Sequence, residues 1–319
     1  MNEMDLDERL QIDPSSVEEK IVEFLRSYLE ERDIEGLILL FRDDVESLVN
    51  VKLASAAVGA ENISLIVTQG RFSSRKPTRE RDTELIKQYL NLPNESLVFI
   101  NIEKIIRDIG RVYSEKTGMM VARSATDSLP ILNYNLSYIL FKSMARDDFE
   151  LETFSPPSKR PGTKREKFIR QSIAHYKSRI RLNMLLSFLL AEIENKSYIG
   201  HVNKTEWLLG LFTKFGTYHA ADFLPLAALY KTQVVQLAEY LNLNKYLDER
   251  VEKIPTSYRF FFDLSYREVD RVLLRLEVGG YSMEEIHQET GVHFDAIQKI
   301  RYYYDVSKYA RAVPLIPEI

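Results

Sequence analysis

The sequence contains no cysteine among its 319 residues. Disulfide bonds and thiolate nucleophiles are therefore excluded, and we expect a cytoplasmic protein. Glycine is scarce, with 12 residues, which limits the number of backbone loops that could approach a phosphate closely. No apolar run reaches the roughly 18 residues that a membrane helix needs, and the acidic stretch 1–10 lacks the pattern of a signal peptide. We therefore expect no membrane partner.

An excess of positive charge is also missing, since the formal net charge is −4. The global basic field that typically favours nucleic acid is therefore absent. The composition is 45% hydrophobic and 28% charged residues, which is ordinary for a globular protein. The length fits one large domain or one domain with an appendage, and we predict a single domain over residues 1–319.

Short apolar runs alternate with helical patterns in the first hundred residues. The runs predict strands at 37–41, 63–67 and 97–100, and the patterns between them predict helices at 45–58 and 83–90. Buried strands separated by helices are typical of a parallel sheet. We therefore predict an α/β fold with a Rossmann-like parallel sheet in three layers.

Helical patterns dominate the rest of the chain. They cover 168–190, 231–241 and most of 265–309, so we predict a helical C-terminal part. The proline-containing segment 150–163 is predicted to be a loop within the domain. Near the beginning, Ser15 and Glu18 have the spacing of a capping box, which predicts that the first helix starts there.

The junction between the first strand and the next helix is where a nucleotide fold usually binds an anion. Here the junction reads Arg42-Asp43-Asp44. Phosphate can approach the backbone closely only past small residues, and two carboxylates would repel it. We therefore favour a structural role, in which Asp43 or Asp44 caps the helix and interacts with its dipole.

Two other groups of charged residues have both a structural and a functional interpretation. Lys177 and Arg181 share a helix face, while Arg179 points elsewhere; the spacing alone favours a solvated basic face. Glu206 is a suitable ligand for a hard metal ion. A glutamate near a lysine such as Lys204 is, however, more often half of an ion pair.

Residues 282–301 have the pattern of a helix-turn-helix, which could indicate DNA binding. The second helix of that pattern offers only Lys299 and Arg301 as bases, with Asp295 against them. We therefore favour a packing role for this segment and predict no nucleic-acid partner.

The segment 199–233 places charged residues among apolar ones, which is costly unless they pair or bind a ligand. It also resembles the ammonia-dependent NAD synthetase family, of the ATP-pyrophosphatase group. The family patterns are Gly-Thr-Gly-Asn-Lys-Ser-Glu, Phe-Thr-Lys-Tyr-Gly-Asp, Ala-Asp-Leu-x-Pro-Leu, Leu-Tyr-Lys-Thr-Gln and Lys-Ala-Arg-x-Arg. The matching residues are 200–206, 212–217, 221–226, 229–233 and 177–181, with further matches at 255–256 and 264–270.

This resemblance implies an adenine-nucleotide-hydrolase-like fold, a homodimer and a reaction that uses ATP and Mg²⁺. Members of the family adenylate the carboxylate of deamido-NAD, and ammonia then displaces AMP to form the amide of NAD. By position, the resemblance assigns ATP contacts to Ser47, Lys231 and Thr256. It assigns deamido-NAD contacts to Arg179, Lys214 and Asp222, and metal contacts to Glu46 and Glu206.

Departures from the family pattern cluster around the nucleotide phosphates. The family loop Ser-Gly-Gly-x-Asp-Ser aligns with residues 42–47, so both glycines are missing and Glu46 is one methylene longer than the family's aspartate. His201 replaces a threonine that contacts the nucleotide, and Tyr309-Ala310 replaces a His-Lys pair. Two functions remain open: an ATP-dependent amide ligase, with the family's or a changed acyl substrate, and a non-catalytic dinucleotide-binding or regulatory paralogue. The loop favours the second.

Overall fold

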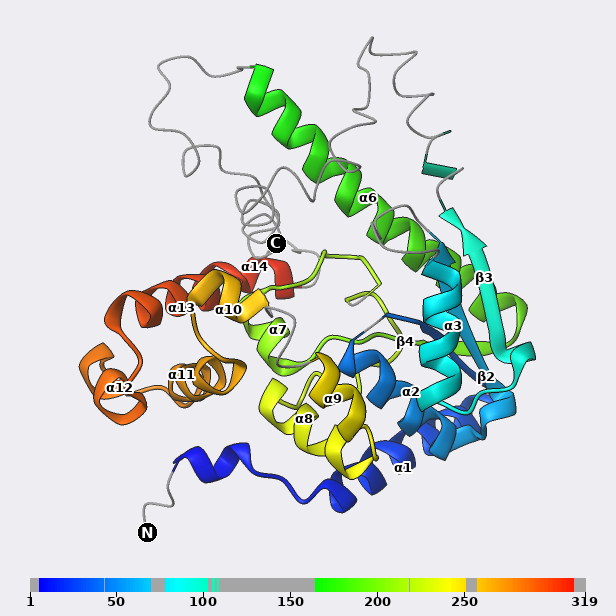
Figure 1. Cartoon of the computed structure of the whole chain (residues 1–319), viewed down its shortest axis with the longest axis horizontal. Coiled ribbons are helices and arrows are strands. Elements are labelled where there is room, and N and C mark those ends of the chain that lie inside the picture. The colour runs from blue at the N-terminus through cyan, green and yellow to red at the C-terminus, as the bar shows by residue number, and fades with distance from the viewer. Residues whose placement is uncertain are drawn as a thin grey trace, which may run out of the picture.

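The centre of the molecule is a parallel sheet with the strand order β3-β2-β1-β4 (Figure 1). The computed structural model describes residues 6–42, 44–69, 78–102, 105–106, 108, 164–217, 219–250 and 257–312. Within them the strands are β1 (Gly36–Leu40), β2 (Ile63–Gln69), β3 (Leu97–Asn101) and β4 (Lys196–Ile199). The three predicted strands are confirmed, and β4 is a fourth that the sequence analysis did not predict.

Strand β1 lies between β2 and β4, so that Leu37 pairs with Ile63 on one side and with Ser197 on the other. All five of its residues are buried, because helices cover both faces of the sheet. Leu37 and Leu39 belong to the larger core cluster on one face, while Ile38 and Leu40 belong to the cluster on the other. This arrangement confirms the three-layer prediction.

The larger cluster is formed with helices on one side of the sheet, whereas α6 (Lys164–Ile193) packs on the other. Figure 1 shows α6 as a long helix that extends beyond the sheet. None of the described helices is both long and apolar enough to cross a membrane. The helices of the larger cluster are α1 (Pro14–Arg32), α2 (Val45–Val58), α3 (Thr78–Tyr89), α8 (Lys231–Tyr240) and α9 (Asn244–Arg250).

Helix α2 ends before Gly59, as predicted, but the predicted start of α1 is wrong. The N-cap of α1 is Asp13, whose carboxylate accepts a hydrogen bond from the backbone N–H of Ser15 at 3.2 Å. Pro14 explains the difference, because proline is favoured in the first turn of a helix, where its missing N–H costs nothing. The cap therefore lies two residues before Ser15.

The C-terminal part is helical and has a core cluster of its own. In Figure 1 its helices are coloured from green (α7) through yellow-orange (α10) and orange to red (α14). Arg275 connects it to the N-terminal turn η1 (Leu6–Leu10), since its guanidinium lies 2.8 Å from the Asp7 carboxylate. The helices are α7 (Lys204–Leu209), α10 (Ser257–Phe262), α11 (Tyr266–Val278), α12 (Met283–Thr290), α13 (Phe294–Val306) and α14 (Lys308–Arg311).

Helices α12 and α13 form the predicted helix-turn-helix, with Gly291 in the left-handed region at φ 72°. Ile286, Ile297 and Ile300 are fully buried between the helices of this lobe. The ammonium of Lys299 donates a hydrogen bond to the carbonyl of Phe261 at the end of α10. These contacts give the segment the packing role that the sequence favoured. The predicted loop at 150–163 lies outside the described residues.

Candidate functional site

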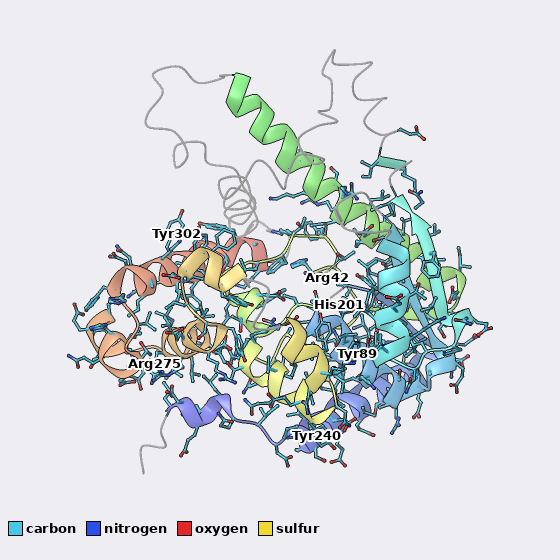
Figure 2. All side chains as sticks on the ribbon, viewed as in Figure 1. Arg42, Tyr89, His201, Tyr240, Arg275 and Tyr302 are labelled. Atoms are coloured by element: carbon cyan, nitrogen blue, oxygen red, sulfur yellow. The ribbon has the colours of Figure 1, made fainter. Side chains whose placement is uncertain are left out.

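The candidate site lies at the carboxyl ends of β1 and β4. Strands β2 and β3 lie on one side of β1, and β4 lies on its other side. The order of the strands along the chain therefore reverses between β1 and β4. Ligands of open α/β sheets bind in the crevice at such a reversal. Figure 2 shows Arg42 and His201, which follow these two strands, close to one another on the side of the C-terminal helices.

At the start of α2, the side chains of the loop form bonds with other residues of the same loop. The Asp44 carboxylate accepts a hydrogen bond from the backbone N–H of Ser47 at 2.9 Å and forms a 2.8 Å ion pair with Arg42. The Ser47 hydroxyl accepts a hydrogen bond from the backbone N–H of Arg42. Asp44 is thus the predicted cap, while Asp43 lies outside the described residues. A carboxylate of the protein occupies the position where a helix N-terminus would attract an anion.

His201 joins the end of β1 to the end of β4. Its Nε2 lies 2.7 Å from the carbonyl of Leu40, and its Nδ1 lies 3.0 Å from the amide nitrogen of Asn50. The same amide nitrogen donates to the carbonyl of Gly200 at 3.2 Å. Burial lowers the pKa of His201 to about 4, so the ring is neutral at pH 7. Both ring nitrogens are therefore used inside the protein, at the position of the family's nucleotide-contacting threonine.

A buried ion pair lies next to this connection. The ammonium of Lys231, in the first turn of α8, is 2.5 Å from the carboxylate of Glu46 in the first turn of α2. The side chain of Asn203 donates to the same carboxylate oxygen at 2.7 Å. Glu46 and Lys231 are only 4% and 8% exposed. A predicted metal ligand and a predicted ATP contact are therefore bound to each other.

Glu206 forms a capping box at the start of α7. Its backbone N–H donates to the Asn203 side chain at 2.8 Å, and its carboxylate accepts from the Asn203 backbone N–H at 3.2 Å. Burial and the nearby Glu46 carboxylate raise the pKa of Glu206 to about 8. The predicted pairing with Lys204 is wrong, because Lys204 binds Glu277 at 2.7 Å. Residues two apart on a helix do not face each other.

The metal assignment of Glu46 and Glu206 stays a prediction. In the described part of the chain, no group of three or more His, Cys, Asp or Glu side chains is arranged to hold a metal ion. The Glu46 carboxylate is bonded to Lys231 and Asn203, a donor set that suits an anionic group held by the protein rather than a divalent cation. Thr256, the third predicted ATP contact, lies outside the described residues.

Asp270 on α11 also belongs to this site, although the sequence analysis did not assign it a role. It is fully buried and accepts hydrogen bonds from the Thr205 hydroxyl at 2.5 Å and from the Thr232 N–H and hydroxyl at 2.7 Å each. Burial raises its pKa to about 6, although these three bonds favour the ionised form. Asp270 fixes the starts of α7 and α8 together, since Thr205 also accepts from the Lys231 N–H.

The predicted dinucleotide contacts Arg179 and Lys214 lie on two elements that touch. The guanidinium of Arg181 donates two hydrogen bonds to the Lys214 carbonyl, at 3.2 and 3.1 Å. Gly216 allows this close approach, because a Cβ there would lie 2.6 Å from the Ile180 side chain. The Lys214 ammonium donates to the carbonyl of Tyr309 at 3.1 Å. The turn around Lys214 therefore connects α6 to α14.

The other residues around this turn agree only partly with the predictions from the sequence. Lys177 is 8% exposed, so the interpretation as a solvated basic face is wrong for it. Asp222 is exposed and attached to β4, since its carboxylate accepts from the Tyr198 N–H at 2.8 Å. Three buried polar atoms of this region have no hydrogen-bond partner among the described residues: Asn183 Oδ1 on α6 and Thr213 Oγ1 and Thr217 Oγ1 on the turn.

Residues 161–314 match the family model described as NAD synthase. The NH3-dependent NAD synthetase of Thermotoga neapolitana is 25% identical over 94% of this chain and 96% of its own length. The enzyme of the same name from Aeropyrum pernix is 26% identical, covering 98% and 92%. The fold is similar to that of an NMN synthetase from Francisella tularensis, with a TM-score of 0.64 and 19% identity over 97% of this chain and 100% of that one.

A second solved structure agrees with this fold. The NH3-dependent NAD synthetase of Campylobacter jejuni has a TM-score of 0.61 and 19% identity, with 97% of this chain and 100% of that one covered. The fold is that of adenine-nucleotide α-hydrolases, as expected. The second half of the chain therefore matches the NAD synthase family model, and the chain resembles NH3-dependent NAD synthetases over most of its length.

Proposed function

We propose that this chain is an NAD synthetase-like protein that binds a dinucleotide such as deamido-NAD without forming the amide. The proposal depends chiefly on one observation: the carboxylate of Asp44 occupies the start of α2. An ATP phosphate would need the N–H groups at this helix end. Two like charges 4 Å apart repel by about 4 kcal/mol at an effective dielectric constant of about 20, so Asp44 disfavours a triphosphate there.

We predict that calorimetry with Mg²⁺ and ATP will detect no binding in the micromolar range. Two features are expected to prevent binding. The Asp44 carboxylate caps the helix end that would bind phosphate, and the Lys231 ammonium is already bound by Glu46. A micromolar dissociation constant corresponds to about −8 kcal/mol, which requires strong contacts to the phosphates. Micromolar binding by the unmodified chain would contradict the proposal and favour an active enzyme.

The dinucleotide half of the proposal is supported by the region around Lys214. Arg179 and Lys214 lie on adjoining elements, and a guanidinium offers planar paired donors to phosphate or carboxylate groups. A buried polar atom without a partner costs about 1–3 kcal/mol. Bound ligand or water at Thr213 and Thr217 would remove that cost.

We predict that NAD or deamido-NAD stabilises the protein. At a concentration of 100 times the dissociation constant, the melting temperature should rise by about 3–5 °C. Arg179→Ala and Lys214→Ala should each remove most of this shift, whereas Arg32→Ala, on the opposite layer of the fold, should leave it unchanged. The retained dinucleotide site is excluded if the parent shows no shift, or if both site variants show the full shift.

An active amide ligase is the second candidate, because Ser47, Glu206 and Lys231 keep the family's residue types. The structural neighbour from Francisella tularensis is an NMN synthetase, so a mononucleotide belongs among the tested ligands. The assay supplies ammonia, ATP, Mg²⁺ and either deamido-NAD or nicotinate mononucleotide, and follows AMP release. Turnover above that of a Lys231→Met control would establish the ligase and overturn the non-catalytic proposal.

The family resemblance also implies a homodimer, and α6 offers a surface for one. Leu185, Leu189 and Ile193 follow each other at four-residue spacing and are 59%, 51% and 70% exposed, so they form one apolar stripe. We predict that light scattering gives twice the chain mass of 37.2 kDa at micromolar concentration. Leu189→Lys should shift the protein to monomer, whereas Phe294→Lys in the C-terminal lobe should not. A monomeric parent would exclude the dimer.

A further inference from the structure

The buried pair of Glu46 and Lys231 has the geometry of an occupied anion site. Two donors, the Lys231 ammonium at 2.5 Å and the Asn203 side-chain amide at 2.7 Å, converge on one oxygen of Glu46. All three residues are more than nine-tenths buried. Such charge-assisted bonds to a carboxylate have the same chemistry as bonds to a phosphate oxygen.

The other charged groups around Lys231 are already engaged. Asp270 accepts three hydrogen bonds from Thr205 and Thr232. Glu206, whose pKa is raised, forms the capping box of α7. Within the described residues, Glu46 is thus the carboxylate that binds the ammonium directly. If Glu46 were removed, Lys231 and Asn203 would keep their positions on α8 and before α7 but would lose their acceptor.

We propose that Glu46 acts as an intramolecular ligand, whose carboxylate fills a site for a phosphoryl oxygen built by Lys231 and Asn203. A free phosphate group and Glu46 exclude one another there. The extra methylene of Glu46, relative to the family's aspartate, gives the carboxylate the reach to bind the ammonium on α8. This inference builds on the proposed function, because it names what keeps phosphate from Lys231, but it is tested with a different ligand and different residues.

The test uses the full chain and inorganic pyrophosphate as the probe. Glu46→Ala should melt at a lower temperature than the parent, because Lys231 is left buried without its counter-ion. Pyrophosphate should then restore part of the lost melting temperature, and it should bind at least tenfold more tightly than to the parent, a difference of about 1.4 kcal/mol. Sodium chloride at matched ionic strength controls for general screening.

The double variant Glu46→Ala/Lys231→Met is the matched control, since it removes the donor together with the acceptor. It should lose the response to pyrophosphate. If Glu46→Ala does not fold, Glu46→Gln keeps the side-chain volume and should show the same direction of change. The inference is overturned if the single variants bind pyrophosphate no better than the parent, or if the double variant binds it equally well. A missing dinucleotide shift in the parent would affect only the proposed function.

Discussion

Replacing Lys231 with methionine is expected to lower the free energy of unfolding by about 3–5 kcal/mol. Glu46 would remain buried with only the Asn203 amide as a donor, and an unpaired buried charge costs about that much. Methionine keeps the length of the side chain, so lost packing contributes little. Urea unfolding followed by circular dichroism measures the change, provided that the slope with denaturant stays constant.

Two further variants separate the charge effect from a general loss of structure. Lys308→Met removes an exposed lysine that pairs with Asp305 on the surface and should change stability by less than about 1 kcal/mol. The double variant Lys231→Met/Glu46→Gln should recover much of the loss, because neither buried charge remains. A loss below about 1 kcal/mol for Lys231→Met alone would mean that the pair is not buried as described.

The second large effect concerns pH and Asp270. Its pKa is about 6 in the folded protein against an ordinary value of 3.8, so ionisation destabilises the fold. Stability from the protonated form is complete below pH 3.8 and is lost as the pH rises through 6. The gap between the two pKa values corresponds to about 3 kcal/mol. Part of this loss has already occurred at pH 4, so the parent should lose about 2.4 kcal/mol more between pH 4 and pH 7 than Asp270→Asn, which cannot ionise.

The comparison with Asp270→Asn isolates this one carboxyl group. Other titrating groups, such as Glu206 with its raised pKa and Asp7 with its lowered pKa, are present in both proteins and largely cancel in the difference. Urea unfolding at several pH values gives the two curves. Parallel curves would show that the hydrogen bonds from Thr205 and Thr232 keep Asp270 ionised throughout, against the effect of burial.

The sheet was largely predictable because its central strand β1 is apolar from Leu37 to Leu40 and the neighbouring β2 is mostly apolar. Strand β1 begins at Gly36, is buried on both faces and is followed by the N-cap of α2. The apolar run and the residues at its two ends therefore indicate the same strand boundaries. Strand β4 was missed because it is short and contains Lys196 and Ser197. Its position depends on pairing with β1, a contact between residues far apart in the sequence. Local propensity does not contain that information.

The sequence indicated several residues of the site, but it did not indicate which of them bind to each other. Asp44 as a helix cap follows from local chemistry, whereas the binding of Glu46 to Lys231 joins two helices that are distant in the chain. Asp270 did leave a signal, since it is a charged residue between the buried Val269 and Val272 of an amphipathic helix. A charge on that face requires a partner, but the sequence does not show which one.

The position of β4 has a consequence for synthesis on the ribosome. Strand β1 pairs with β2 soon after both emerge, but its other edge pairs with β4, about 160 residues later. At about 5–20 residues per second, the apolar edge of β1 waits roughly 10–30 s for its partner strand. An unpaired apolar edge is a template for association with other chains. Nascent chains that stall before residue 196 are therefore the ones expected to depend on chaperones.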